Sequence, residues 1–257
     1  TVVTIIYDAL DRVVAPKNRK AFVSALINMW YMNENAMQNI RSKIFLRKDI
    51  YDREVHVPDK VKLKNYSVTI AWEYDQLFGM VWKRAASASE SAKKLYENIT
   101  KKQMQKISGL GYIPITNEEE NRDMLSVLVG VKMGSGNKAS TYNWFKNRLA
   151  DTQGTIVPRS MIDIFAKASD QEIELQREGK QPGSKSIIRP RCFEDVLPEV
   201  SEKRVIDLKE EFQEYAPFFE SLKDTIQRSP VVESVLSSAL ERSGFSNPRE
   251  EILNLIN

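Results

Sequence analysis

The chain begins with an apolar run, TVVTIIY, that leads directly into Asp8. Its apolar residues stand in adjacent pairs, Val2–Val3 and Ile5–Ile6, whereas a strand with one face in water alternates apolar and polar side chains. An uninterrupted apolar strand needs cover on both faces, as a central strand of a parallel sheet has. The sequence therefore predicts that a strand buried on both faces opens the chain and that the fold is of the α/β class.

The cysteine and histidine content excludes several kinds of site. The sequence of 257 residues contains one cysteine, Cys192, and one histidine, His56. It therefore has no intramolecular disulfide, no zinc site built from Cys and His, and no HExxH metalloprotease motif. Any chemistry must use carboxylates, lysines or arginines, hydroxyls, or a bound cofactor.

The length and the charge restrict the class of protein further. A chain of 257 residues suits one large domain or two small ones, and a formal net charge of +3 is too small to indicate nucleic acid. The sequence has no apolar stretch of the length that spans a membrane, and it does not begin with the basic segment of a signal peptide. We therefore expect a cytoplasmic protein without a membrane partner.

Periodicity divides the chain into an α/β part followed by helices. A helical pattern over 18–33 separates the first strand from a second apolar run at 43–47, and a third run at 67–71 precedes another helical pattern. We expect residues 2–7 and both later runs to form one parallel sheet. From about residue 74 the pattern stays helical.

A stretch rich in Pro, Gly, Ser and Lys at 176–186 has the composition of a surface linker. Together with the change of pattern, it suggests three parts. We expect an α/β part at 1–86, a helical region at 87–180 and a helical C-terminal module at 181–257.

Asp8 and Asp11 form the strongest local signal, IIYDALDR. A carboxylate at the carboxyl end of a buried parallel strand points into the crevice where α/β sheets bind ligands. There Asp8 can hold Mg²⁺ on a nucleotide through water, because Mg²⁺ takes oxygen ligands and keeps several waters. The alternative is that Asp8 or Asp11 caps the helix that follows.

The run that ends in DALDR resembles the Walker B strand of P-loop NTPases, in the DxxD form of the STAND and KAP-like branches of the AAA+ class. SKIFLRKD resembles the sensor strand that follows, which implies that Arg47 donates hydrogen bonds to the γ-phosphate. IVPRSMIDIF resembles the lid helix of these ATPases, with Arg159 as a second sensor. Taken alone, Arg47 fits a solvated surface side chain, and Arg159 fits an arginine in an ordinary first helical turn.

A longer run, GVKMGSGNKASTYNWFKNRLADTQGTIVPRS, resembles a segment of bacterial P-loop ATPases. Together with the DALDR and FLR pieces, the resemblance covers roughly residues 1–170. It implies a partial parallel P-loop-type sheet, a mainly helical lid, and binding of ATP with Mg²⁺ in the complete protein. In the implied reaction water attacks the γ-phosphate, Asp8 organises Mg²⁺, and Asp11 helps to order Mg²⁺ or water. Arg47 and Arg159 bind the nucleotide and stabilise charge, and movement of the lid switches an effector or partner protein.

The sequence lacks the phosphate-binding loop that this family requires, GxxxxGK[ST]. The nearest candidate, GSGNKAS at 134–140, has the wrong spacing and no buried strand before it, so it is expected to form a turn. Because Walker A precedes Walker B in the family, we expect the sequence to be the C-terminal part of a longer ATPase. Asp8 and Arg47 should lie within about 10 Å of each other at one sheet edge.

A different class of function also fits the sequence. In this alternative the chain is a non-enzymatic helical interaction module, whose aspartates cap helices and whose apolar helices dock a partner protein. Lysines and arginines between residues 12 and 64 suit a solvated face better than a nucleic-acid site, because aromatic residues do not interleave them. We therefore do not expect nucleic acid as a partner. Under the ATPase hypothesis the expected ligand is a nucleotide, and self-association as a homo-oligomer stays open.

Overall fold

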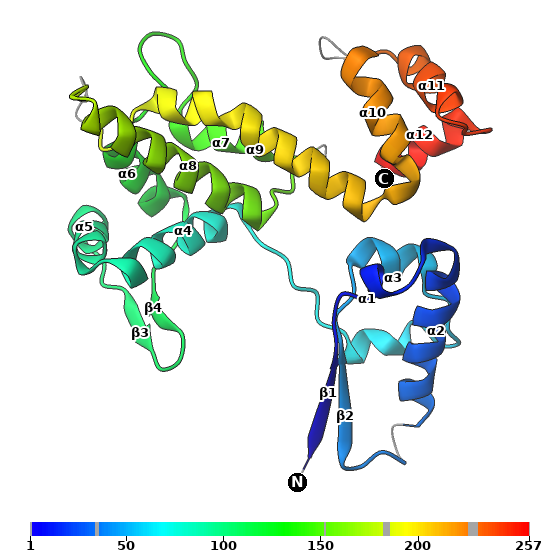
Figure 1. Cartoon of the computed structure of the whole chain (residues 1–257). Helices are drawn as coiled ribbons and strands as arrows, with labels where there is room; N and C mark the ends of the chain where they lie inside the picture. The colour runs from blue at the N-terminus through cyan, green and yellow to red at the C-terminus, as the bar shows by residue number, and fades with distance from the viewer. Residues whose placement is uncertain (1, 34–35, 152, 182–185, 226–230, 257) are drawn as a thin grey trace. The chain divides into compact units, whose positions relative to one another are not determined.

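The computed structural model describes residues 2–33, 36–151, 153–181, 186–225 and 231–256. The fold is mixed α/β and mostly helical (Figure 1). The chain divides into two units, Thr1–Ala71 and Trp72–Asn257. Each unit has buried apolar residues of its own.

The described part of the first unit contains a pair of strands, three α-helices and a 3₁₀ helix: β1 (Val3–Tyr7), α1 (Leu10–Val13), α2 (Pro16–Met32), β2 (Ile40–Ile44), α3 (Lys48–Glu54) and η1 (Lys62–Tyr66). β1 and β2 pair in parallel, with Val3 opposite Ile40 and Tyr7 opposite Ile44. Parallel strands need a long crossover connection, and α2 supplies it. The opening strand and the helix expected over 18–33 are therefore confirmed.

Two expectations about the sheet are wrong. The second strand is Ile40–Ile44 rather than 43–47, and residues 67–71 belong to no strand, so the described sheet around β1 has two strands instead of three. A run of β-branched residues becomes a strand only where a neighbouring strand offers it hydrogen bonds. In the described part of the first unit, β1 and β2 pair with each other and leave 67–71 without a ladder.

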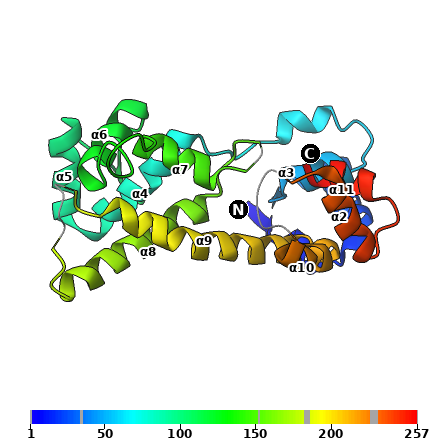
Figure 2. The same cartoon turned by 90° about the horizontal axis from the view of Figure 1, so that it is seen from above.

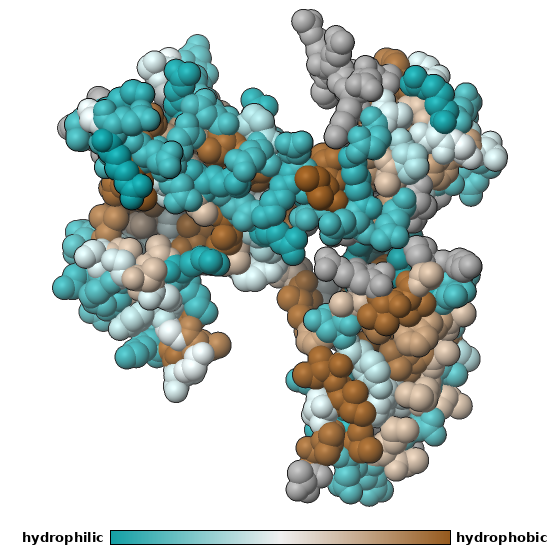
Figure 3. All heavy atoms as spheres, in the orientation of Figure 1, coloured by the Kyte–Doolittle hydropathy of each residue, from teal (hydrophilic) through white to brown (hydrophobic). Residues whose placement is uncertain are grey.

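The strands are also more exposed than the sequence predicts. On β1, Val3 keeps 54% of its surface exposed and Ile6 keeps 63%, although their side chains point to opposite faces. Figure 3 shows apolar side chains gathered over this part of the first unit. Burial on both faces is therefore not reached, because the helices of this unit cover too little of the sheet.

The core of the first unit lies between its helices. Val23 on α2, Ile50 on α3 and Val55 after it are almost completely buried. Arg19 on α2 also donates two hydrogen bonds from Nε to the carboxylate of Glu54, at 2.9 and 3.2 Å. These contacts fasten the end of α3 to α2, which matters because α3 begins close to the end of β2.

The described residues of the second unit are mainly helical and include a short antiparallel hairpin. Its elements are α4 (Tyr74–Ala88), α5 (Glu90–Thr100), β3 (Gln105–Ile107), β4 (Gly111–Ile113), α6 (Glu118–Leu128), α7 (Thr141–Leu149), α8 (Pro158–Arg177), α9 (Pro190–Glu211), η2 (Gln213–Tyr215), α10 (Ala216–Thr225), α11 (Glu233–Arg242) and α12 (Pro248–Ile256). The mainly helical character expected after residue 74 is confirmed. Among the described residues, no helix is both long enough and apolar enough to cross a bilayer.

The main core of the second unit is built around aromatic rings. Phe145 stacks on Phe165 with ring centres 5.0 Å apart, and Phe193 meets both rings edge-on at 5.2 Å. These residues come from α7, α8 and α9, and Phe78 on α4 contacts Phe145 edge-on at 5.8 Å. α4 packs into this core, and the division into two compact units falls before α4. The boundary expected at residue 86 stays a prediction.

α8 and α9 form a hairpin. Arg159 at the start of α8 pairs with Asp207 near the end of α9, and Glu172 near the end of α8 pairs with Arg189 at the start of α9. The two helices therefore run antiparallel and lie side by side (Figure 2). The boundary expected after residue 180 lies in the connection between these two helices and stays a prediction.

The end of the chain forms a small helical cluster, as the sequence predicts for the last part of 181–257. α10, α11 and α12 share a buried core made of Phe218, Ala239, Leu240 and Ile252. The linker expected at 176–186 lies partly outside the described residues, at 182–185.

Candidate functional site

The carboxyl ends of β1 and β2 lie side by side. Tyr7 is paired with Ile44, and the N–H of Phe45 donates to the carbonyl oxygen of Tyr7 at 2.8 Å. Asp8 follows β1 at this end, and Arg47 follows β2 after a short extension. Ligands of parallel sheets bind at this end. The separation of about 10 Å between Asp8 and Arg47 stays a prediction.

Asp8 is exposed and bonded to the backbone beside it. Its Oδ1 accepts a hydrogen bond from the N–H of Ala9 at 2.7 Å. Ala9 has a φ of 54°, in the left-handed region, where a non-glycine residue costs about 1 kcal/mol or more. This strained turn fixes the direction in which the chain leaves the strand at Asp8.

The helix after Asp8 tests the alternative role of the aspartates as caps. The N-cap residue of α1 is Ala9, and no side chain caps it. Asp11 lies inside α1, and its side chain falls outside the described residues. Asp8 is therefore not the N-cap residue of α1. For Asp11, both the cap alternative and the role in ordering Mg²⁺ or water stay predictions.

Arg47 stands at the N-cap position of α3 and forms a two-pronged ion pair with Asp49. Its Nε donates to Oδ1 of Asp49 at 3.1 Å, and its Nη2 donates to Oδ2 at 2.8 Å. The side chains are 28% and 35% exposed, so neither is fully solvated. Asp49 is not among the residues that the sequence pattern singles out, although FLRKD places a carboxylate two positions after the arginine.

Arg159 belongs to the second unit, in the first turn of α8. Its guanidinium donates to Asp207 on α9 at 3.1 Å, and its side chain is 59% exposed. A cation at a helix N-terminus and a carboxylate near a helix C-terminus are both opposed by the helix dipole. Each residue thus offsets an unfavourable position of the other. The role of Arg159 as a second sensor stays a prediction.

Asp8 is the residue that the sequence assigns to Mg²⁺ at the strand ends. Mg²⁺ in nucleotide sites is held by one or two carboxylates together with phosphates and several waters. Asp8 supplies an exposed carboxylate of that kind. Among the described residues, three or more His, Cys, Asp or Glu side chains do not gather anywhere into a metal-binding group. The assignment of Mg²⁺ to Asp8 therefore stays a prediction.

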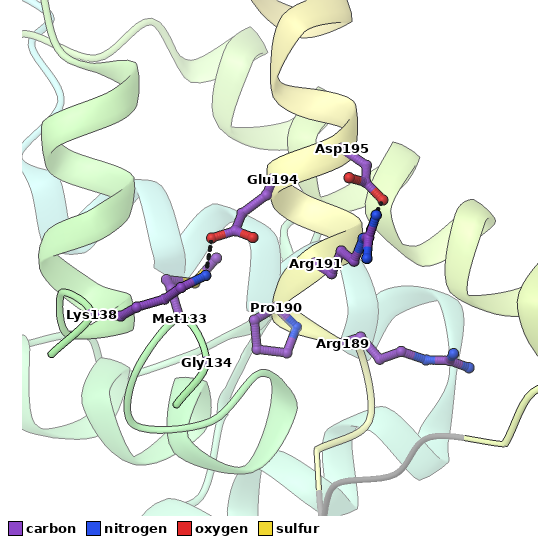
Figure 4. Close-up of a pocket in the computed structure, with 8 residues that line it drawn as sticks. All are labelled: Met133, Gly134, Lys138, Arg189, Pro190, Arg191, Glu194 and Asp195. Atoms are coloured by element: carbon purple, nitrogen blue, oxygen red, sulfur yellow. Dashed lines mark hydrogen bonds and ion pairs between the residues drawn. The ribbon is translucent and has the colours of Figure 1, made fainter. Parts of the chain in front are cut away.

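An open hollow of about 470 Å³ lies in the second unit, between the GSGNKAS segment at 134–140 and the start of α9 (Figure 4). Lys138 on its wall pairs with Glu194 at 2.9 Å, and Arg191 pairs with Asp195 at 3.5 Å. Arg189 turns away from these pairs in Figure 4. The cations that line the hollow are thus neutralised by carboxylates, which does not favour a phosphate there.

Comparisons of the chain with protein-family models, with curated proteins and with solved structures found no match. Fold and site therefore define a coarse class: a mixed α/β protein, mostly helical, with a two-stranded parallel sheet. The P-loop type of the sheet stays a prediction that rests on the residues quoted from the sequence.

Proposed function

We propose that this chain is part of a P-loop ATPase that binds and hydrolyses ATP and works as a nucleotide-driven switch. The observation that carries the proposal is the parallel pair of β1 and β2, whose carboxyl ends lead into Asp8 and Arg47. A carboxylate attracts Mg²⁺, and a guanidinium attracts phosphate. The same end of the sheet thus offers complementary charge for both parts of Mg²⁺–ATP.

Each residue has a separate task in this proposal. Asp8 holds Mg²⁺ through water, and Arg47 donates from its planar guanidinium to the γ-phosphate. Asp11 orders Mg²⁺ or the attacking water. The role of Arg159 as a second sensor is carried by the sequence resemblance alone. These tasks are electrostatic, as expected for phosphoryl transfer, in which positioning and charge stabilisation supply most of the catalysis.

Exposed apolar side chains support a larger sheet than the one described. Val3 and Ile6 on β1 are more than half exposed, and so are Val68 and Ile70 in the segment that forms no strand. Large apolar side chains exposed on both faces of a strand leave these faces open to cover by other protein. Since the sequence has no GxxxxGK[ST] loop, the activity requires a phosphate-binding segment from outside these 257 residues.

The test of the proposal is the ATP turnover of the full-length protein with Asp8→Asn. Removing the carboxylate charge weakens the organisation of Mg²⁺, so we expect turnover to fall about 100-fold or more while the fold is retained. Asp52→Asn is a matched control, because Asp52 is an exposed carboxylate of the same unit that pairs with Lys48. Unchanged turnover in Asp8→Asn would place the Mg²⁺ site elsewhere, and a full-length protein without ATP turnover would favour the helical interaction module.

The isolated 257-residue chain should bind ATP weakly or not at all. Asp8, Arg47 and Arg159 lack the ring of backbone amides, the Lys and the hydroxyl that a phosphate-binding loop contributes. Titration calorimetry with Mg²⁺–ATP measures this directly. Micromolar affinity in the isolated chain would mean that the nucleotide site is made of other residues.

A further inference from the structure

The guanidinium of Arg47 is already engaged by an acidic side chain. Asp49 accepts hydrogen bonds from Nε and Nη2, the two parallel N–H groups on one side of the guanidinium. Carboxylate and phosphate oxygens match this two-pronged geometry equally well. Asp49 therefore occupies an edge of the Arg47 guanidinium, formed by Nε and Nη2, that is also suited to bind a phosphate group.

The position of Asp49 allows it to release the arginine. Asp49 stands in the first turn of α3, where the helix dipole favours a negative charge. Its side chain is 35% exposed, so water can replace the lost hydrogen bonds. The carboxylate thus remains stabilised after Arg47 has left, and the exchange leaves no buried charge without a partner.

The other end of α3 is held independently of this pair. Glu54 is bonded to Arg19 on α2, and Lys60 donates to the carbonyl oxygens of Tyr51 and Val55 at 2.7 and 2.9 Å. A change of partner at Arg47 therefore affects the start of α3, while its end stays fastened to the first unit.

We infer that Asp49 is an internal competitor of the γ-phosphate, which holds Arg47 in the nucleotide-free protein and yields it when ATP binds. The inference rests on the proposed ATPase function. It adds a regulatory contact, because the γ-phosphate must displace Asp49 before it can bind Arg47. The opening of the Arg47–Asp49 pair then transmits the binding of the γ-phosphate to the start of α3. ADP lacks the γ-phosphate and therefore leaves the pair closed.

The experiment measures the affinities of the full-length protein for Mg²⁺–ATP and Mg²⁺–ADP with Asp49→Asn. We expect ATP to bind about threefold more tightly, the size of effect that a partly exposed ion pair produces, and ADP to bind as before. Asp52→Asn is the matched control, since it removes the same charge from the same helix without touching Arg47. In an Arg47→Ala background, Asp49→Asn should have no effect on ATP affinity.

The outcomes separate this inference from the proposed function. If Arg47→Ala weakens ATP binding but Asp49→Asn leaves it unchanged, the site stands and the competition is wrong. Weaker ATP binding in Asp49→Asn would also overturn the inference, because Asp49 would then orient Arg47 toward phosphate. Equal gains for ATP and ADP, or equal gains in Asp52→Asn, would assign the effect to net charge. If neither Asp8→Asn nor Arg47→Ala alters ATP binding or turnover, the proposed function fails as well.

Discussion

Glu172 is a buried carboxylate that joins the end of α8 to the start of α9. It accepts hydrogen bonds from the backbone N–H of Arg189 at 3.0 Å and from the guanidinium of that residue. Burial alone would raise the pKa of Glu172, but hydrogen bonds from Gln176, Arg189 and Cys192 outweigh it and hold the pKa below the ordinary value. The folded state therefore favours the charged form of Glu172.

Glu172→Gln should lower the free energy of unfolding by about 3 kcal/mol at pH 7, because it removes one partner of a buried ion pair. Urea denaturation measures the difference. Glu199→Gln is the control, since Glu199 is an exposed partner of Lys167 and should contribute less than about 1 kcal/mol. Equal losses in the two variants would mean that the burial of Glu172 has no energetic consequence.

The stabilisation by Glu172 should depend on pH in a defined direction. Because the pKa is depressed in the folded state, the contribution is complete above the unfolded value of 4.5 and is lost as pH falls through the lower folded pKa. The difference in unfolding free energy between wild type and Glu172→Gln should therefore shrink below about pH 4. A difference that stays constant into this acidic range would contradict the assignment.

Cys192 should be chemically inert in the folded protein. Its side chain is 1% exposed, and burial, together with the charge and hydrogen bonding of Glu172, raises the pKa of the thiol to about 11. At pH 8 the reactive thiolate is scarce, and reagents cannot reach it. A maleimide should therefore label Cys192 at the rate of unfolding, and rapid labelling without urea would show that α9 opens locally.

At the scale of elements, a polar network joins α4, α6 and α7 inside the apolar core. Asn121 on α6 accepts from the indole N–H of Trp82 at 2.9 Å and donates to Oδ1 of Asp75 at 2.8 Å. The hydroxyl of Tyr142 donates to the same Asp75 oxygen at 2.9 Å. The fully buried amide of Asn121 thus provides hydrogen-bond partners for both the indole of Trp82 and the carboxylate of Asp75, which fixes the relative rotation of the helices.

Asn121→Leu should destabilise the protein by about 3 kcal/mol, because it leaves the indole of Trp82 and the carboxylate of Asp75 without their shared partner. The change can be followed by thermal and urea unfolding. Asn98→Leu on α5 is the matched control, since this asparagine is exposed and the same substitution there should change stability by less than about 0.5 kcal/mol. A neutral Asn121→Leu would mean that the network is dispensable.

At the scale of the whole molecule, the two units differ in how complete they are. The second unit contains a large aromatic core and a small helical cluster. The first unit buries apolar residues between its helices but leaves both faces of a two-stranded sheet partly open. Since an isolated pair of strands is marginal in water, the second unit should be the more stable of the two.

Residues 72–257 expressed alone should therefore unfold cooperatively, whereas residues 1–71 alone should unfold without a sharp transition or aggregate. Near-ultraviolet circular dichroism during a thermal melt tests the first part, since Trp82 and Trp144 are both buried in the second unit. Light scattering tests the second part. A sharp transition in residues 1–71 would show that two strands and their helices suffice.

Local patterns in the sequence determined the helices and the opening strand. The periodic apolar residues over 18–33 and the helical pattern after residue 74 depend on neighbours within a few residues. The placement of Asp8 after the opening strand follows from the same local signals, whereas Arg47 lies three residues beyond β2, at the N-cap position of α3. These features could be predicted because a helical turn or a strand end is defined by residues adjacent in the chain.

Only the tertiary structure decided pairing, burial and the partners of charged side chains. Residues 67–71 have the composition of a strand, yet a strand exists only where another offers a hydrogen-bonded ladder. Glu172 and Asn121 are buried by residues from other helices. Arg159 pairs with Asp207, which lies on a different helix and far away in the sequence. Composition and spacing alone do not specify such contacts, because they arise only when separate elements pack against one another.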